Sequence, residues 1–462
     1  MRSRRGHLVK FINLTRATEI GANSYYLESG PQRIVLDCGM HPKKEGDASL
    51  PNLDLLEGRP LDAIIVSHAH QDHIGTLPVL MRRHPGARVF MSEPTAEIGS
   101  ALLHNSVNVM TRQREELGAT TFPLFTHREA TRAAAAWRHC RFRQQVHIGR
   151  KEGGGDGISF EMFDAGHVLG SAGLLLRMEG RTLFYSGDVN FDDQTIAQAA
   201  RFPESGVDVL IMECTRGDHG LPPEFTRAAE ERRLAETIDR TFARGGCVLV
   251  PVFALGKTQE ALAMFYKFRR AGLLRDCPIY IGGLSAKMTE IYDRFALTSR
   301  RQLPRLQLLE EMAPFILNGQ TIHDAPPRAG RIYALSSGMM TPKTLSHTFA
   351  RPILHNPKHA ICFVGYTDPE SPAGVLKAAA PGELVALAPE PAQELRCGIE
   401  QFQFSAHASR ESIVAYVEKL APRKIVLVHG DPSAVEWMRA TIAAALPGSE
   451  VIIPPPGVEI EL

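Results

Sequence analysis

The sequence predicts a layered α/β protein, because two kinds of segment alternate along it. One kind has apolar residues at helical spacing, as in 224–244, a stretch that the pair Gly245-Gly246 ends. The other kind is a short apolar strand that ends in small or polar residues. Such alternation is typical of sheets covered by helices, and 462 residues suffice for about two to four domains. The predicted strands are Arg33–Leu36, Ala63–Val66, Val207–Met212, Cys247–Pro251, Pro278–Ile281, Ile361–Val364 and Lys424–Val428.

The bulk composition is that of an ordinary globular protein, with 44% hydrophobic and 22% charged residues. The formal net charge is only +1, so the chain as a whole is not basic enough to hold a nucleic acid. A polyanion would have to be bound by a local basic patch or by metal ions. Net charge therefore neither supports nor excludes a nucleic-acid substrate.

Cysteine usage and hydropathy predict the cellular compartment of the protein. Seven cysteines are scattered along the chain, their number is odd, and no C-x-x-C pair occurs. This pattern is typical of a reduced cytoplasmic protein. No apolar run approaches the roughly 20 residues that a membrane span needs, and the basic start Met1–Arg5 leads into no apolar signal core. We therefore expect a cytoplasmic protein with no membrane association.

A dense cluster of metal-ligand residues follows the apolar segment Leu61–Val66. Residues two apart in an extended chain face the same way, so His68 and His70 can share one metal ion. Asp72 and His73, beyond the turn, can reach a second ion. Imidazole together with carboxylate suits zinc better than magnesium or calcium. The alternative, histidines that merely cap a helix, would not need four ligand-type residues within six positions.

Three further residues could belong to a metal site, and two of them stand where predicted strands end. His167 lies among glycines, where the backbone can approach an ion closely. Asp188 ends the strand Thr182–Tyr185 and offers a carboxylate that can bridge two cations. Asp37 closes the strand Arg33–Leu36 and could orient ligands by hydrogen bonding. Each could singly be a turn residue, but their joint order indicates a metal centre.

These residues, in this order along the chain, resemble the successive signature motifs of the metallo-β-lactamase superfamily. The resemblance implies an αββα sandwich with two zinc ions at one edge. In the β-lactam and thiol-ester branches a last metal histidine follows soon after the bridging aspartate, whereas this chain continues through further motifs. Those motifs, which contain Glu213, His407 and His429, resemble motifs A, B and C of the β-CASP RNA-processing nucleases.

The β-CASP resemblance covers nearly the whole chain and implies a domain layout. Residues 1–215 would form the first part of the metallo-β-lactamase domain, residues 216–395 an inserted α/β β-CASP domain, and residues 396–462 the return that completes the first domain. It also implies a cofactor of two zinc ions. The implied activity is hydrolysis of RNA phosphodiester bonds by a metal-activated hydroxide, as an endonuclease with a potential 5′ exonuclease activity.

The resemblance assigns a role to each motif residue. One zinc ion would be held by His68, His70 and His167, the other by Asp72, His73 and His429, and Asp188 would bridge them. His407, oriented by Glu213, would be the general acid, so that the catalytic set comprises His407, Glu213, Asp72 and Asp188. A ribose 3′-oxygen is a poor leaving group that needs a proton, and histidine titrates in a suitable range.

A second group of residues is predicted to bind the RNA backbone. Lys257, where a strand meets a helix, and Ser336, Ser337 and Gly338, at another strand end, could hold flanking phosphate oxygens. The alternative for Lys257 is a solvated surface lysine. Relatives usually have arginine at that position, and Thr341–Lys343 and 365–374 also depart from the family pattern. The departures leave the metal and acid positions intact, but they put the RNA path and the end preference in question.

Two other functions stay open at this stage. One is a catalytically inactive scaffold, which the intact metal and acid residues disfavour. The other is a DNA nuclease or small-molecule hydrolase on the same fold, against which the motifs at His407 and His429 favour RNA. The partner that we expect is an RNA substrate, and the resemblance leaves open a homodimer or partners in a processing complex.

Overall fold

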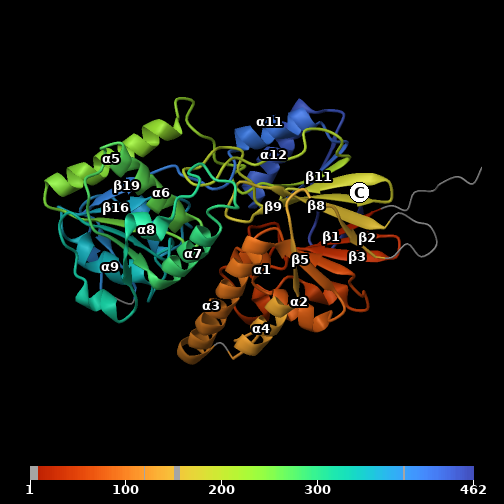
Figure 1. Cartoon of the computed structure of the whole chain (residues 1–462), viewed down its shortest axis with the longest axis horizontal. Coiled ribbons are helices and arrows are strands. Elements are labelled where there is room, and N and C mark those ends of the chain that lie inside the picture. The colour runs from red at the N-terminus through yellow and green to blue at the C-terminus, as the bar shows by residue number, and fades with distance from the viewer. Residues whose placement is uncertain (1–8, 119, 150–156, 389–390) are drawn as a thin grey trace, which may run out of the picture. The chain divides into compact units, whose positions relative to one another are not determined.

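The computed structural model describes residues 9–118, 120–149, 157–388 and 391–462. The chain divides into two compact units (Figure 1). The first unit comprises Met1–Asp192, Ala199–Gly220 and His407–Leu462, and the second comprises Asp193–Gln198 and Leu221–Ala406. The chain thus leaves the first unit, builds the second, and returns. All seven cysteines are buried free thiols.

The first unit contains two seven-stranded sheets. The order in one sheet is β22 (Glu459–Glu461), β1 (Lys10–Asn13), β2 (Tyr25–Ser29), β3 (Gln32–Leu36), β4 (Ala63–Ile65), β5 (Arg88–Ser92) and β6 (Trp137–Cys140). The order in the other is β21 (Glu450–Ile452), β20 (Lys424–Val428), β11 (Val209–Glu213), β10 (Arg181–Tyr185), β9 (Ala172–Met178), β8 (Ile158–Asp164) and β7 (Val146–Ile148).

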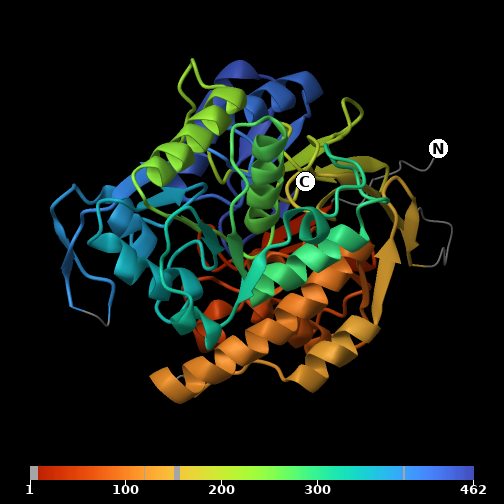
Figure 2. The same cartoon turned by 60° about the vertical axis from the view of Figure 1, so that its left-hand side comes forward.

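Helices cover the outer face of each sheet in this unit. The covering helices are α2 (Leu77–Arg83), α3 (Glu93–Leu117) and α4 (His127–Ala135) on one sheet and α11 (Arg410–Leu420) and α12 (Pro432–Ala445) on the other. Figure 2 shows α3 and α4, in orange, running side by side. The short helix α1 (Gln71–Ile74) and the 3-10 helices η1 (Gly46–Ser49) and η2 (Leu53–Leu56) lie in loops.

The sequence pattern accounts for this layering. Successive strand residues point to opposite faces, and in β4 the side chains of Ala63 and Ile65 enter the core between the sheets, whereas Ile64 enters the core beneath the helices. Because both faces are covered, the strand is apolar throughout rather than alternating. The predicted αββα sandwich is confirmed.

The second unit is built on a six-stranded sheet whose pairings are all parallel. Its order is β14 (Phe315–Leu317), β13 (Ile279–Gly282), β15 (Ile332–Leu335), β12 (Val248–Pro251), β16 (Ala360–Phe363) and β19 (Gly398–Gln401), beside a small pair of β17 (Leu384–Val385) and β18 (Gln393–Glu394). Its helices are α5 (Arg227–Ala243), α6 (Lys257–Arg270), α7 (Gly283–Arg294), α8 (Leu308–Met312), η3 (Thr321–Asp324), α9 (Leu345–Leu354) and α10 (Pro372–Ala378).

One helix begins later than the sequence pattern predicts. The apolar spacing predicts helical structure from Glu224, but α5 begins at Arg227. The side chain of Thr226 accepts a hydrogen bond from the backbone N–H of Ala229 at 3.2 Å, and such a cap satisfies a donor that has no partner within the helix. The residues before Thr226 therefore stay outside the helix.

Candidate metal centre

The candidate metal centre lies in the first unit, where loops leave the ends of strands from both sheets. Two of its residues adopt backbone conformations that side chains rarely tolerate: φ is 58° at Asp37, after β3, and 50° at His429, after β20. Gly166 and Gly187, next to His167 and Asp188, also have positive φ, at 66° and 54°. Such turns redirect the chain sharply, and glycine adopts them without strain.

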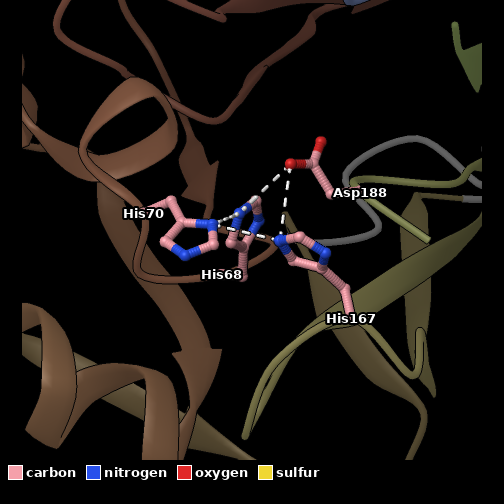
Figure 3. A group of neighbouring side chains, drawn as sticks. All are labelled: His68, His70, His167 and Asp188. Carbon is pink, nitrogen blue, oxygen red and sulfur yellow. Dashed lines mark hydrogen bonds and ion pairs between the residues drawn. The ribbon is translucent and has the colours of Figure 1, made fainter. Parts of the chain in front are cut away.

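Three histidines and one aspartate form a first group of ligand atoms (Figure 3). His70 Nδ1 lies 3.1 Å from His68 Nε2 and 3.0 Å from His167 Nε2. Asp188 Oδ2 lies 3.5 Å from His68 Nε2 and 3.7 Å from His167 Nε2. Four donor atoms from three loops therefore point toward one small volume, as ligands of a single cation do.

A second group faces the other oxygen of the same aspartate. Asp72, His73 and His429 come together, with His429 Nε2 3.3 Å from His73 Nε2 and 3.2 Å from Asp72 Oδ2. His73 Nε2 lies 3.2 Å from Asp188 Oδ1. The carboxylate of Asp188 thus presents one oxygen to each group, which is the geometry of a ligand that bridges two ions.

The bonding of Asp188 tests whether this arrangement fits metal ions. Its Oδ1 is buried and has no hydrogen-bond partner among the described residues. Its nearest polar neighbours are ring nitrogens of the second group, His73 Nε2 at 3.2 Å and His429 Nδ1 at 3.5 Å, and a buried carboxylate oxygen that lacks a hydrogen bond calls for an explanation. A cation between the two groups would satisfy it. Imidazole nitrogens and carboxylate oxygens are also the ligand types that zinc and similar ions accept.

The electrostatics of the two groups suit a cation as well. Burial lowers the pKa of His68 and lowers that of His70 to about 4, so both rings are neutral and can donate lone pairs. Burial also opposes the ionisation of Asp72, but His73 and His429 outweigh it and lower its pKa to about 2. Burial would likewise lower the pKa of His73, yet the surrounding carboxylates hold it well above its usual range. A bound cation would displace that proton.

A buried hydrogen-bond network fixes the orientation of His73. Asp37 Oδ2 lies 2.8 Å from His73 Nδ1 and accepts hydrogen bonds from the hydroxyls of Ser67 and Tyr185, each at 2.7 Å. The backbone N–H of Ser67 donates to Asp37 Oδ1 at 2.6 Å. With Nδ1 held in this way, Nε2 is the nitrogen that faces the other ligand atoms. Asp37 therefore lies where the sequence predicts a residue that orients ligands.

Sequence reasoning missed three hydroxyl groups that hydrogen-bond to residues of the metal centre. Ser67 and Tyr185 stand next to recognised motifs, but nothing in their spacing shows that both point at Asp37. Thr215 is the third, with its Oγ1 2.7 Å from His429 Nδ1. A hydroxyl beside a ligand motif is a weak signal, because its direction depends on how the sheets stack.

Glu213 and His407 form a third group with Asp188. His407 Nδ1 lies 3.1 and 3.2 Å from the two carboxylate oxygens of Glu213 and 4.0 Å from Asp188 Oδ2. Glu213 is buried at the end of β11 and also accepts a 2.7 Å hydrogen bond from the backbone N–H of Val189. The His407 ring is more accessible, with 22% of its side chain exposed.

Comparison with known families identifies this arrangement. Residues 17–216 match the metallo-beta-lactamase superfamily, residues 258–376 the Beta-Casp domain, and residues 393–454 the Zn-dependent metallo-hydrolase RNA specificity domain. The chain is a metallo-β-lactamase superfamily member with a β-CASP domain. The family predicted from the motifs is confirmed.

This metallo-β-lactamase chain resembles curated relatives over most of its length. It is 27% identical over 457 residues to the Endoribonuclease YSH1 of Saccharomyces cerevisiae, covering 96% of this chain and 57% of the relative. It is 28% identical over 485 residues to the Cleavage and polyadenylation specificity factor subunit 3-I of Arabidopsis thaliana, covering 99% and 64%. It is 27% identical over 440 residues to the Cleavage and polyadenylation specificity factor 73 of Drosophila melanogaster, covering 94% and 62%. The chain therefore spans less than two thirds of each of these relatives.

A solved structure shows the same fold. The crystal structure of a protein of unknown function from Enterococcus faecalis V583 matches with a TM-score of 0.53 and 14% identity, over 98% of this chain and all of that one. At this identity the likeness concerns the fold alone. In the part of the chain that the structure describes, no helix combines the length and apolar character needed to cross a membrane.

The residues predicted to bind RNA lie in the second unit of this β-CASP protein, apart in the chain from the metal-ligand residues. Lys257, the first residue of α6, is partly buried, and its Nζ donates to the backbone oxygen of Phe404. It is therefore more than a solvated surface lysine. Ser336, Ser337 and Gly338 follow β15, and the hydroxyl of Ser337 lies 3.1 Å from that of Thr341.

Proposed function

We propose that this chain is a zinc-dependent hydrolase that cleaves the phosphodiester bonds of RNA. The observation that carries the proposal is the buried carboxylate of Asp188, which presents one oxygen to each of two ligand groups. Beside it stands a histidine held by a buried glutamate. Two cation sites and one oriented proton donor are the parts that a two-metal hydrolysis of a phosphodiester uses.

The first zinc ion would be held by His68, His70 and His167, the second by Asp72, His73 and His429, and Asp188 would serve both. Bound there, zinc lowers the pKa of a water molecule and neutralises charge that develops on a phosphate. Asp37 keeps His73 in the tautomer whose Nε2 faces the site, because Nδ1 carries the proton toward the Asp37 carboxylate.

His407 would supply the proton that the leaving ribose 3′-oxygen needs. Its Nδ1 faces Glu213, so Nε2 is the nitrogen that we assign to proton transfer. The contacts of Nδ1 with both carboxylate oxygens of Glu213 limit rotation of the ring. This division of work separates metal binding from proton donation, and the two can be tested separately.

The proposal of RNA as substrate is supported by the match of residues 393–454 to an RNA specificity domain and by relatives named as endoribonucleases. We propose that Lys257, Ser336, Ser337 and Gly338 bind backbone phosphates. We also propose that the β-CASP domain, predicted as residues 216–395, includes β19 and reaches Ala406, because β19 pairs with β16, and that the rest of residues 396–462 completes the hydrolase domain. Internal cleavage is the main activity that we propose, with 5′ exonuclease trimming as a second. The reduced, buried cysteines support a cytoplasmic location.

The test compares single-stranded RNA and DNA of one sequence, each labelled at either end, with zinc-loaded protein. We expect RNA to be cut far faster than DNA. The products should carry a 5′-phosphate and a 3′-hydroxyl, because the proposed nucleophile is a hydroxide and not the ribose 2′-hydroxyl. The two labels distinguish internal cuts from trimming. Equal rates on RNA and DNA would favour a general nuclease, and a 2′,3′-cyclic phosphate would contradict the proposed chemistry. Absence of cleavage would favour an inactive scaffold.

A further inference from the structure

A hollow lies in the second unit where loops leave the carboxyl ends of β12, β15 and β16. The hollow is small and open to solvent. The chain leaves β12 through α6 toward β13 and leaves β15 through α9 toward β16, so the connections from two adjacent parallel strands depart in opposite directions along the sheet. Such switch points are where open α/β sheets bind ligands. The lining of the hollow includes Phe253, Lys257, Gly338, Gly365, Tyr366 and Thr367.

Two aromatic side chains of this lining are exposed to solvent. The exposed fraction is 36% for Phe253 and 58% for Tyr366. Large apolar side chains exposed singly are ordinary on a protein surface, but these two lie in the same hollow. Exposed aromatic rings gathered around a concavity mark a place where a flat apolar surface can bind.

Two glycines shape the hollow around these side chains. A Cβ atom at Gly338 would lie only 3.0 Å from Cε2 and 3.1 Å from Cδ2 of Phe253, so the absence of a side chain lets that ring lie against the backbone. A Cβ at Gly365 would lie 3.5 Å from Cε of Lys257. The aliphatic part of Lys257 thus runs past Gly365, and this side chain lines the same hollow as the two aromatic rings, while its Nζ donates to the backbone oxygen of Phe404.

We propose that this hollow binds one nucleobase of single-stranded RNA, stacked against Tyr366 and Phe253, with Lys257 attracting the adjoining phosphodiester. The inference rests on the proposed ribonuclease function and adds a subsite that holds a base rather than the backbone. Stacking of a base on an aromatic ring is tolerant of sequence, because every base has a flat π face. An RNA strand would thus be bound without a fixed recognition sequence.

The experiment measures kcat and KM on a single-stranded RNA for the wild type and three variants. Tyr366→Ala should raise KM by about 5- to 100-fold, since removal of one stacking platform costs that much affinity, and the loss should fall on KM rather than kcat. Tyr366→Trp should retain the wild-type KM to within about threefold, because it keeps a stacking surface. Phe315→Ala is the matched control: Phe315 is 55% exposed and lies on β14, an edge strand of the same sheet that does not line the hollow.

An abasic nucleotide moved along the RNA separates stacking from general damage. At one position it should raise the wild-type KM and cause no further rise in Tyr366→Ala, since the base and the ring contribute one shared interaction. Equal KM values for the wild type and Tyr366→Ala would overturn the inference. So would a similar rise in Phe315→Ala.

A separate measurement tests the hollow without cleavage. Titration of Tyr366→Trp with adenosine 5′-monophosphate should quench the fluorescence of the introduced indole, relative to the same titration of the wild type. Quenching by a protein that cuts no RNA would contradict the proposed function and support the base site. Cleavage of RNA with no quenching and no effect of the abasic scan would support the proposed function and contradict the base site.

Discussion

At the scale of single residues, the Asp188 carboxylate lies between two sets of ligand atoms and has one oxygen without a hydrogen bond among the described residues. Asp188→Ala should therefore remove zinc from both sets and abolish hydrolysis, because its two oxygens lie beside the two sets. Zinc per chain, measured by elemental analysis, should fall from about two to less than one. Asp276→Ala, which changes an aspartate that is 93% exposed, should keep the wild-type content. A wild-type stoichiometry of one, unaltered in Asp188→Ala, would contradict the dinuclear site.

For His407 we predict a different outcome, because its Nδ1 hydrogen-bonds to Glu213 rather than to the histidines of the two ligand groups. His407→Ala should keep the zinc content of the wild type while turnover falls by about 10² to 10⁴. Elemental analysis and a single-turnover assay on the same preparation measure the two quantities. His219→Ala, at an exposed histidine of the same unit, is the control. Loss of zinc from His407→Ala would reassign the residue as a ligand.

At the scale of elements, the loop after β3 is packed directly against the metal-ligand loop. A Cβ at Gly39 would lie 1.7 Å from the carbonyl oxygen of Asp72, an atom that also accepts a 2.9 Å hydrogen bond from the backbone of Asn23. Gly39→Ala should therefore displace the Asp72 loop, lower stability by about 1–3 kcal/mol and weaken zinc binding. Thermal unfolding and a competitive zinc titration measure these effects.

The matched control for that variant is Gly86→Ala, at an exposed glycine with nothing within 4 Å of the added Cβ. It should unfold at the wild-type temperature and bind zinc normally. If Gly39→Ala were also indistinguishable from the wild type, the loop after β3 would not constrain the ligand set.

At the scale of the whole molecule, the metal centre joins loops that are far apart in the sequence, since His73 follows β4 of one sheet and His429 follows β20 of the other. A ligand that binds only the folded state raises its stability by mass action. Removal of zinc by a chelator should therefore lower the unfolding temperature, and added zinc should restore it in proportion to the logarithm of its concentration. Asp188→Ala should show no such dependence. An unfolding temperature independent of zinc in the wild type would indicate that no ion is bound at this centre.

The sequence by itself determined the fold class and the family. Strands such as Ala63–Ile65 are apolar throughout because both faces of the sheet are covered, and that pattern is local enough to be recognised without a structure. The run from His68 to His73 also predicts paired ligands from spacing alone. The roles of these residues, and of His407 and Lys257, stay predictions until zinc and RNA are measured.

The tertiary structure alone decided which atoms meet. The three hydrogen bonds from side chains to Asp37 Oδ2 come from Ser67, His73 and Tyr185, and the last of these residues is 148 positions away. The contact of Lys257 with the backbone of Phe404 and the hollow beside Tyr366 are equally invisible in the sequence. The physical reason is that hydrogen bonds and hollows depend on how sheets and loops pack, and residue spacing along one chain does not encode the distance between two strands that are remote in that chain.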